Sequence, residues 1–295
     1  MLDRKQFDLL AALEKNRKPM TYLQLSEMTG YPLEAVAHAL EEMERNQLTD
    51  QGAITQRGVE ALEPYRAKRA IFIAAGFGSR MVPITLNTPK PLVRVNGKRI
   101  IDGLIDACLA AGIDEIYIVR GYLAEQFDQL LYKYPMIRFL ENPIYNKANN
   151  ISSAVCVRHM LSNAYVFEAD LLLYNPEIIC KYHYCSDFLA IYKERTDDWC
   201  FDTENGVITG QKIGGLNCWQ EVGTSYWNET DGRKLFGHLK EVYNMPGGKE
   251  KYWDQVPLDV FKDQYRVEIK ACKASDIVEI DTFRELKAID KSYDV

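Results

Sequence analysis

The fold is decided by the stretch Ala70-Ile71-Phe72-Ile73-Ala74-Ala75-Gly76-Phe77-Gly78-Ser79-Arg80. Its apolar first part predicts a β-strand, and its glycines predict a loop whose bare backbone N–H groups can approach a phosphate. Arg80, and then Lys90 in Thr88-Pro89-Lys90-Pro91-Leu92, add two cations where anionic oxygens would lie. The stretch therefore predicts the front of a nucleotide site that begins near residue 69.

Other kinds of glycine loop fit these residues less well. A P-loop requires Gly-Lys-Ser/Thr, whereas this chain has Gly78-Ser79-Arg80. A dinucleotide-binding fingerprint requires a third glycine, and Met81 stands at that position. An ordinary tight turn would explain the glycines alone, but not a preceding strand and two following basic residues.

The composition is typical of a globular protein without membrane segments. The 295 residues suffice for one large or two modest domains, and the apolar content of 47% is ordinary. No apolar run approaches the ~20 residues that span a membrane, and residues 1–5 have no apolar signal region, so we expect neither membrane insertion nor secretion. The net charge of −6 argues against a general nucleic-acid binder.

The cysteines favour a cytoplasmic protein with reduced thiols. Seven are scattered along the chain without a Cys-x-x-Cys pair, and their number is odd. Cys180, His183 and Cys185 lie close together in the sequence, as zinc ligands do. No second ligand pair with the spacing of a zinc finger follows, so packing and surface roles are favoured over a zinc site.

Residues 1–66 predict a small helical domain. An apolar stripe predicts a first helix, and Thr21 followed by Gln24 resembles a capping box that opens a second one. Pro32 is well placed to start a third helix, and residues 48–55 predict a short β-hairpin. This order of elements resembles a winged helix-turn-helix domain.

Charge argues against DNA as the partner of this N-terminal domain. Residues 1–68 hold nine Lys or Arg and eleven Asp or Glu, a net charge of −2, and acidic side chains outnumber basic ones on the third predicted helix. Affinity for DNA depends mainly on neutralising phosphates, so such a helix is poorly suited to it. We expect the domain to form a homodimer or to dock a partner.

Residues 67–295 predict an α/β domain with a mostly parallel, Rossmann-like sheet flanked by helices. Expected strands alternate with expected helices along this part: strands 71–73, 115–119, 137–140 and 165–168, and helices 100–111, 123–132 and 152–161. In such a sheet the ligand lies beyond the carboxyl ends of the strands. Gly76, Gly121, Asn142 and Asp170 all fall at such ends, so we expect their loops to converge.

Several short motifs together resemble those of the nucleotidyltransferases that act on sugar phosphates and related substrates. They are Ala74-Ala75-Gly76-Phe77-Gly78-Ser79-Arg80-Met81, Thr88-Pro89-Lys90-Pro91-Leu92 and Val95-x-Gly97-Lys98. A narrower resemblance, to the bacterial CTP:phosphocholine cytidylyltransferases, rests on Gly121-Tyr122-x-x-Glu125-Gln126-Phe127, Tyr145, Asn149-Asn150-x-x-Ser153, Ala169-Asp170, Tyr252-Trp253-Asp254 and Glu279-Ile280-Asp281-Thr282. It covers about residues 69–295. The helical N-terminal part is absent from the minimal form of that enzyme.

This resemblance implies the reaction CTP + phosphocholine → CDP-choline + pyrophosphate. It also implies that Arg80 and Lys90 are catalytic residues that hold the triphosphate and stabilise the leaving pyrophosphate, and that Asp170 and Asp281 hold Mg²⁺. The second pKa of a substrate phosphate is near ~6, so the acceptor is largely a dianion at neutral pH and can attack without a general base. The task of such an enzyme is positioning and charge neutralisation.

The residue types leave a second interpretation open for the metal pair. Asp170 ends an apolar strand, where a carboxylate is costly unless it is paired or metal-bound, but a turn or helix cap also explains an aspartate there. Asp281 followed by Thr282 is also typical of a helix start.

Selection of the base is expected from loop backbone and a few polar side chains. Cytosine presents an amino donor and a ring acceptor, which a backbone carbonyl and a hydroxyl or amide can match. Residue types separate CTP from UTP only weakly, and N-capping explains an Asn-Asn pair equally well. The expected nucleotide-binding residues are Ala75, Gly76, Phe77, Gly78, Ser79, Gly121, Tyr122, Asn150 and Ser153.

The choline end of the acceptor is expected to meet aromatic rings. A quaternary ammonium has no N–H to donate, so ring faces and sometimes a carboxylate hold it. Each ring taken singly is more typical of core or surface packing, and it is the clustering of Trp and Tyr in this half that favours a cage. The resemblance places the expected choline-binding residues in the acceptor half of the domain: Trp199, Tyr226, Tyr252, Trp253 and Asp254.

Two other functions remain open on the residues alone. The acceptor could be 2-aminoethylphosphonate or phosphoethanolamine, whose primary ammonium has three donors and favours carboxylates such as Asp197, Asp198 and Asp254. A winged-helix regulator whose second domain only senses a ligand is disfavoured, because a sensor need not keep two cations and a metal pair. The sequence does not indicate the role of the N-terminal domain, the oligomeric state, or the molecule that receives the product.

Overall fold

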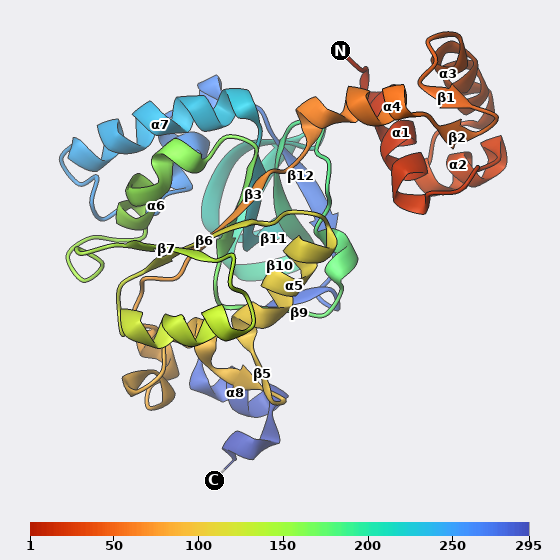
Figure 1. The fold of residues 1–295 in the computed structure, drawn as a ribbon. Coiled ribbons are helices and arrows are strands. Elements are labelled where there is room, and N and C mark those ends of the chain that lie inside the picture. The colour runs from red at the N-terminus through yellow and green to blue at the C-terminus, as the bar shows by residue number, and fades with distance from the viewer. Residues whose placement is uncertain (295) are drawn as a thin grey trace. The chain divides into compact units, whose positions relative to one another are not determined.

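The computed structural model describes residues 1–294 and divides into two compact units, residues 1–66 and the part from Ala67 onward (Figure 1). The smaller unit contains helices and one short β-ribbon. The larger unit contains a seven-stranded sheet with helices around it.

The N-terminal unit has the elements that the sequence predicts. Its elements are α1 (Arg4–Asn16), α2 (Tyr22–Thr29), α3 (Leu33–Arg45), β1 (Thr49–Asp50), β2 (Ala53–Ile54) and α4 (Gln56–Leu62). The capping box of Thr21 and Gln24 is present at the start of α2, and the hairpin of β1 and β2 turns at Gly52 with φ of +76°. Pro32 occupies the N-cap of α3. Assignment to the winged-helix class, and a dimer through this unit, stay predictions.

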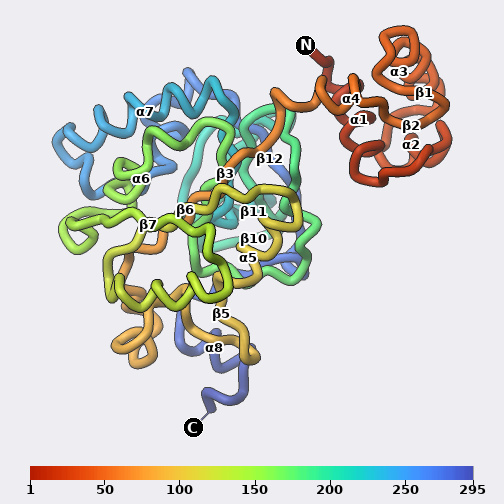
Figure 2. Tube along the Cα trace, viewed as in Figure 1, coloured from red at the N-terminus to blue at the C-terminus, as the bar shows by residue number. Residues whose placement is uncertain are grey.

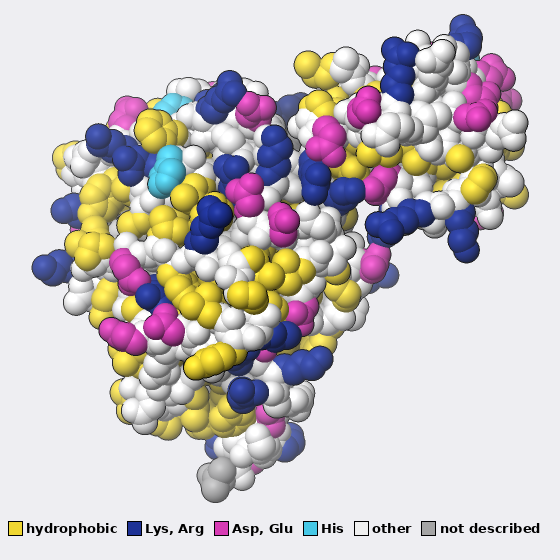
Figure 3. Space-filling model, viewed as in Figure 1, with side chains coloured by type: hydrophobic (Ala, Val, Ile, Leu, Met, Phe, Trp, Pro, Cys, Tyr) yellow, Lys and Arg dark blue, Asp and Glu magenta, His cyan; other side chains and the backbone are white. Residues whose placement is uncertain are grey.

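Charges of both signs are interspersed on the face of the N-terminal unit that Figure 3 shows. Helix α3 carries acidic residues in its first turn and beyond it, with Arg45 at its end. A phosphate backbone requires a basic surface, and that this unit does not bind DNA stays a prediction.

The sheet of the larger unit is mostly parallel in its central part, as expected. The four predicted strands are β3 (Arg69–Ile73), β6 (Glu115–Arg120), β7 (Arg138–Glu141) and β8 (Ala164–Glu168). Strand β3 pairs in parallel with both β6 and β8, and β6 pairs in parallel with β7. The course of the chain through these strands can be followed in Figure 2. Their carboxyl ends therefore lie at one edge of the sheet.

Three further strands extend the sheet beyond β8 in the order β10-β12-β11-β8-β3-β6-β7. They are β10 (Ser186–Glu204), β11 (Val207–Trp227) and β12 (Val267–Cys272). Strands β10 and β11 form a long antiparallel hairpin, β11 runs antiparallel to β8, and β12 runs parallel to β10. The register of the hairpin shifts at several points, so the two strands bend.

Hydrophobic cores lie on both faces of the sheet, because neighbouring strand residues point to opposite sides. Phe72 belongs to the core beneath α5 (Ile100–Ala110), and Ile71 to the core beneath α6 (Ile151–Val157) and α7 (Glu229–Asn244). The helix expected at 123–132 is a 3₁₀-helix, Ala124–Tyr132. Further short 3₁₀ or π turns are Glu63–Tyr65, Ser79–Met81, Ile84–Leu86, Lys90–Leu92, Arg158–Met160, Pro176–Ile178, Val256–Val260, Lys262–Gln264 and Lys291–Tyr293.

The C-terminal segment returns to the glycine loop. Strand β13 (Ile277–Glu279) pairs with β9 (Leu171–Leu173), which follows β8, and the small ribbon of β4 (Arg94–Val95) and β5 (Lys98–Arg99) lies close in sequence to the loop. A third apolar core joins this segment, including α8 (Phe283–Ile289), to the loop; its buried members are Met81, Val93, Val95, Ile100, Ile280 and Leu286. Asp281 is thereby carried to the end of β3.

Within residues 1–294 no helix combines the length and the apolar character that a membrane crossing requires.

Replacement of Trp227 by alanine should lower the free energy of unfolding by about 3–5 kcal/mol, because the cavity left in a dense core cannot collapse fully. Trp227 is completely buried and packs edge-on against Trp253 and Tyr265 at ring distances of 5.7 and 5.9 Å. Urea unfolding followed by circular dichroism measures the loss. Tyr132→Ala, at a ring that is 96% exposed, is the control and should change stability by no more than about 0.5 kcal/mol.

Candidate active site

The glycine loop follows β3 and is held by hydrogen bonds from neighbouring segments. The N–H of Tyr122 donates to the carbonyl of Ala75 at 3.1 Å, and the hydroxyl of Thr85 donates to the carbonyl of Gly78 at 2.9 Å. Gly78 has φ of +67°, and a Cβ there would lie 3.2 Å from Cβ of Lys90. A Cβ at Gly76 would meet nothing within 4 Å. Gly78 thus serves the turn, whereas Gly76 leaves open space above the backbone.

A cation network connects the loop to the C-terminal segment. Nζ of Lys90 donates to Asp170 Oδ2 at 2.7 Å and to Asp281 Oδ1 at 3.0 Å, and Nη1 of Arg80 lies 2.6 Å from Asp281 Oδ2. The side chain of Lys90 is only 10% exposed, whereas that of Arg80 is 67% exposed. Burial by itself would lower the pKa of Lys90, but the two carboxylates outweigh it and raise that pKa. Lys90 is therefore a fixed cation, and Arg80 is free to move toward an anionic ligand.

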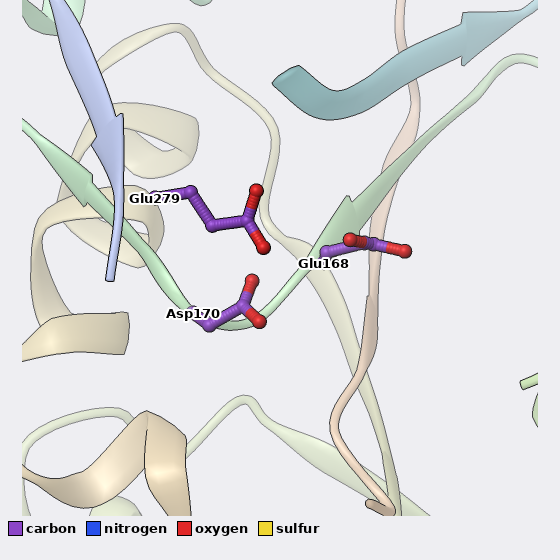
Figure 4. A group of neighbouring side chains, drawn as sticks. All are labelled: Glu168, Asp170 and Glu279. Carbon is purple, nitrogen blue, oxygen red and sulfur yellow. The ribbon is translucent and has the colours of Figure 1, made fainter. Parts of the chain in front are cut away.

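Three carboxylates behind this network form the one group within residues 1–294 that could hold a metal ion. Ligand oxygens of Glu168, Asp170 and Glu279 lie within 4.8 Å of one another, and Figure 4 shows Glu279 and Asp170 pointing toward each other. Burial, with the neighbouring acidic groups, raises the pKa of Glu168 to about 8 and that of Glu279 to about 10. The site therefore gathers more acidic groups than its cations balance, and these two carboxyl groups hold protons more tightly than usual.

These residues fit a divalent cation. Oδ1 of Asp170 is buried and has no hydrogen-bond partner within residues 1–294, which is costly for a carboxylate oxygen. Hard carboxylate oxygens together with substrate phosphates are the ligands that Mg²⁺ prefers. Of the predicted metal pair, Asp170 belongs to the three-carboxylate cluster, while Asp281 contacts Lys90 and Arg80 at its margin.

Three adjoining hollows open around these charges. The loop hollow, of about 250 Å³, is lined by the glycine loop together with Arg80, Lys90, Asp170 and Asp281. The asparagine hollow, of about 260 Å³, shares Gly76 and Arg80 with it. The asparagine hollow is lined by Ile73, Ala75, Gly76, Arg80, Asn142, Tyr145, Ala148, Asn149, Asn150, Ser152, Ser153, Glu168, Ala169, Asp170, Tyr252 and Glu279. Of the four loops expected to converge, those after β3, β7 and β8 line these hollows, and the loop of Gly121 after β6 does not.

The asparagine hollow brings together Ala75, Gly76, Asn150 and Ser153 of the predicted nucleotide residues. The side chain of Asn150 is already used by the protein: Nδ2 donates to Glu168 at 3.3 Å, and Oδ1 accepts the N–H of Trp253 at 2.8 Å. The hydroxyl of Ser153 accepts from Nδ2 of Asn142 at 3.0 Å. Asn150 thus positions an acid of the cluster, which is a different role from the base reading that we expected.

Phe77, Gly121 and Tyr122 support the loops and do not line these hollows. The rings of Phe77 and Tyr122 meet edge-on at 4.7 Å, and the hydroxyl of Tyr122 donates to the carbonyls of Thr85 and Leu86. A Cβ at Gly121 would lie 2.7 Å from the ring of Tyr145, which does line the asparagine hollow. Ser79 and Gly78 line the loop hollow.

The third space, the carboxylate hollow, combines acids with two rings. It is lined by Arg80, Glu168, Asp198, Trp199, Glu221, Gly223, Tyr252, Asp254, Glu279 and Asp281. The rings of Trp199 and Tyr252 stand at 72° to each other with their centres 5.8 Å apart. Burial raises the pKa of Asp254 to about 6 and raises that of Glu221 well above its usual range. Such a hollow suits a cation with an apolar surface.

Two of the five residues predicted for choline lie elsewhere. Tyr226 is completely buried, stacks on His183 with ring centres 3.9 Å apart and donates its hydroxyl to Asn163. Trp253 is 2% exposed and packs against Trp227 in the core under α7. Their rings were attributed to a cage because they are aromatic, but both satisfy packing demands. His183, for which a packing role was expected in preference to zinc binding, is also a core residue and contacts Asp187.

Several residues that line these hollows were not among the site residues predicted from the sequence. Glu168 and Glu279 each lie two positions before a predicted metal ligand, and such a Glu-x-Asp repeat is the signal that could have found them. Asn142 and Tyr145 belong to the loop after β7. Glu221 lies in the long hairpin, where no motif marks it.

Comparison with known proteins identifies this arrangement. The family model described as Nucleotidyl transferase matches residues 69–203. A 2-aminoethylphosphonate cytidylyltransferase of Lancefieldella rimae is 35% identical over 228 residues, which cover 76% of this chain and 92% of the relative. The chain belongs to the nucleotidyl transferase family.

Two further comparisons concern proteins of one organism. The choline-phosphate cytidylyltransferase of Streptococcus pneumoniae is 31% identical over 229 residues, covering 76% of this chain and 97% of the relative. The solved structure of the CTP:phosphocholine cytidylyltransferase from the same organism matches with a TM-score of 0.71 at 30% identity, over 76% of this chain and 98% of that one. The predicted α/β fold class of the larger unit is confirmed, and the protein is a nucleotidyltransferase.

Alanine at two glycines of this nucleotidyltransferase should change different properties, stability at Gly121 and nucleotide binding at Gly76. Gly121→Ala drives a methyl into Tyr145 and should cost about 1–3 kcal/mol of unfolding free energy through overpacking. Gly76→Ala has room for its methyl and should leave stability within about 0.5 kcal/mol of wild type. The Gly76 methyl projects from the lining of two hollows, so it should weaken nucleotide binding. Urea unfolding and nucleotide titration calorimetry on both variants measure the contrast; equal loss of stability would contradict it.

Proposed function

We propose that the protein transfers CMP from CTP to phosphocholine, which yields CDP-choline and pyrophosphate. The observation that carries this proposal is the edge-to-face pair of Trp199 and Tyr252 in a hollow rich in carboxylates. Ring faces and nearby negative charge are what a trimethylammonium group requires, since it has no N–H to donate. The hollow shares Arg80 with the loop hollow, where the phosphates would lie.

The residues support an in-line attack of the acceptor phosphate on the α-phosphorus. Lys90, held by two aspartates, supplies fixed positive charge beneath the triphosphate, and the exposed Arg80 can follow the charge that develops on pyrophosphate. The acceptor phosphate is already a dianion at neutral pH, so no side chain need remove a proton. The P–O bond to pyrophosphate breaks as the bond to the acceptor oxygen forms.

Mg²⁺ is the metal that this proposal implies. Asp170 would hold it, with Glu168, Glu279 or Asp281 as the further protein ligands. When bound, it neutralises phosphate oxygens and aligns them for the displacement. Lys90 and Arg80 would keep Asp281 oriented toward the same place.

A second acceptor, 2-aminoethylphosphonate, has an observation in its favour. The relative from Lancefieldella rimae is named for that substrate, and the carboxylate hollow contains more acids than rings. A primary ammonium has three N–H donors, which carboxylates satisfy better than rings. The ring pair favours phosphocholine over this alternative.

Pyrophosphate release should require CTP, Mg²⁺ and phosphocholine together. We expect the kcat/KM for phosphocholine to exceed those for phosphoethanolamine and 2-aminoethylphosphonate by about tenfold or more, because only the trimethylated ammonium covers both rings. A coupled pyrophosphate assay with each acceptor measures this. A preference for 2-aminoethylphosphonate would replace the acceptor in our proposal, and absence of release with all three would refute the proposal.

Asp170→Asn should lower kcat by about 10²-fold or more, because it removes a negative charge from the carboxylate cluster and an anionic partner from Lys90. The Mg²⁺ concentration for half-maximal rate should rise in the same variant. The matched control is Asp197→Asn, whose side chain is 93% exposed and which should keep wild-type kinetics. Unchanged Mg²⁺ dependence in Asp170→Asn would place the metal elsewhere.

A further inference from the structure

The lining of the carboxylate hollow contains many more acidic residues than basic ones. Arg80 is the only basic residue in its lining, and Arg80 is paired with Asp281. Two of the other acids have partners: Asp198 accepts the N–H of Trp199 at 2.8 Å, and Glu168 accepts from Asn150 at 3.3 Å.

Glu221 has no such partner in the part of the chain that the structure describes. Within residues 1–294 its carboxylate has no hydrogen bond and no ion pair, although it is partly buried between the carboxylate hollow and a neighbouring hollow. Lys193 lines the neighbouring hollow but forms no ion pair with it. Burial, followed by the charges of Asp254 and Glu168, raises the pKa of Glu221 well above its usual range. A ligand cation placed here would relieve both the burial and the repulsion.

The backbone directs Glu221 into this position. In the β10–β11 hairpin Phe188 pairs with Ser225, and Ala190 pairs with Glu221. Between these two pairs β11 therefore advances by four residues while β10 advances by two. Such a bulge re-aims the side chains that flank it. Gly223, inside the bulge, has φ of +47°, and a Cβ there would lie 3.0 Å from the Glu168 carboxylate. The bulge thus brings two carboxylates to one hollow.

We propose that Glu221 selects the cationic acceptor, with its carboxylate facing the ammonium end of the molecule that receives CMP. This inference rests on the proposed function. It names Glu221 as the residue through which the site requires a positive charge on the acceptor, in addition to a head group of suitable shape. Trp199 and Tyr252 recognise the apolar surface of the head group. Glu221 recognises its positive charge, which a hydrocarbon of the same shape lacks.

The experiment compares acceptors that differ only in charge. Phosphocholine is paired with 3,3-dimethylbutyl phosphate, in which carbon replaces the ammonium nitrogen, and phosphoethanolamine is paired with propyl phosphate. The kcat/KM for each is measured with saturating CTP and Mg²⁺ for wild type, Glu221→Gln and Glu221→Met. Glu204→Gln, at an exposed glutamate near the end of the same hairpin, is the control.

Wild type should prefer the cationic member of at least one pair by about tenfold or more, because a neighbouring carboxylate attracts it in a poorly solvated hollow. Glu221→Gln and Glu221→Met should reduce that ratio to about one third or less of the wild-type ratio, through the KM of the cationic acceptor, while the KM for CTP stays unchanged. The thermal midpoint of either variant should not fall, since an unpaired acid has been removed.

The outcomes separate this inference from the proposed function. Wild type that turns over none of the four acceptors refutes the proposed function. Wild type that turns over a cationic acceptor, with the same charge preference in both Glu221 variants, refutes the role of Glu221. A loss that is equal for the cationic and neutral members shows that Glu221 acts on the structure of the hollow, and it also overturns the inference.

Discussion

The ion bridge from Lys90 to Asp170 and Asp281 is the interaction on which the site depends. It joins the end of β8 to the C-terminal segment, which lies more than a hundred residues later in the chain. A buried ammonium is stable only if carboxylates surround it, and two buried carboxylates tolerate each other only with a cation between them. Removing any one member therefore leaves an uncompensated charge. The apolar core around Met81 and Ile280 keeps the three groups in contact.

The balance of charged groups changes across Arg80, which lines both the loop hollow and the carboxylate hollow. In the loop hollow Arg80 and Lys90 face two aspartates, whereas among the described residues of the carboxylate hollow Arg80 is the one basic residue beside six acidic ones. A substrate that carries phosphate at one end and an ammonium at the other matches this gradient. The same arrangement discourages a sugar phosphate, whose hydroxyl groups would leave buried carboxylates without a counter-charge.

Much of the larger unit could be predicted because local patterns determine it. The strands β3, β6, β7 and β8 are short apolar runs that end in turn residues, and the parallel order follows from the helices between them. The glycine loop, Lys90 and Asp170, which the structure brings to one hollow, could be singled out because a phosphate and a metal demand particular residue types at strand ends.

The acceptor half was predicted less well, because its residues meet through long-range pairing. Strands β10 and β11 bend and shift register, so alternation along them does not tell which side chains face the hollow. Tyr226 and Tyr252 are both tyrosines near motif positions, yet one fills the core and the other lines the site. Glu221 has no sequence signal at all, since its direction depends on a bulge around Gly223.

Two acids of the carboxylate hollow would connect the proposed metal and nucleotide site with the proposed acceptor site. Glu168 and Glu279 lie between the cluster that would hold the metal and the hollow that would hold the ammonium, and they line both. Each positive charge that arrives lowers the cost of ionising these carboxylates, which then attract the next positive charge more strongly. On the proposed function, metal-bound nucleotide and cationic acceptor would therefore be coupled through the same acids, and an acceptor without its charge would leave that coupling incomplete.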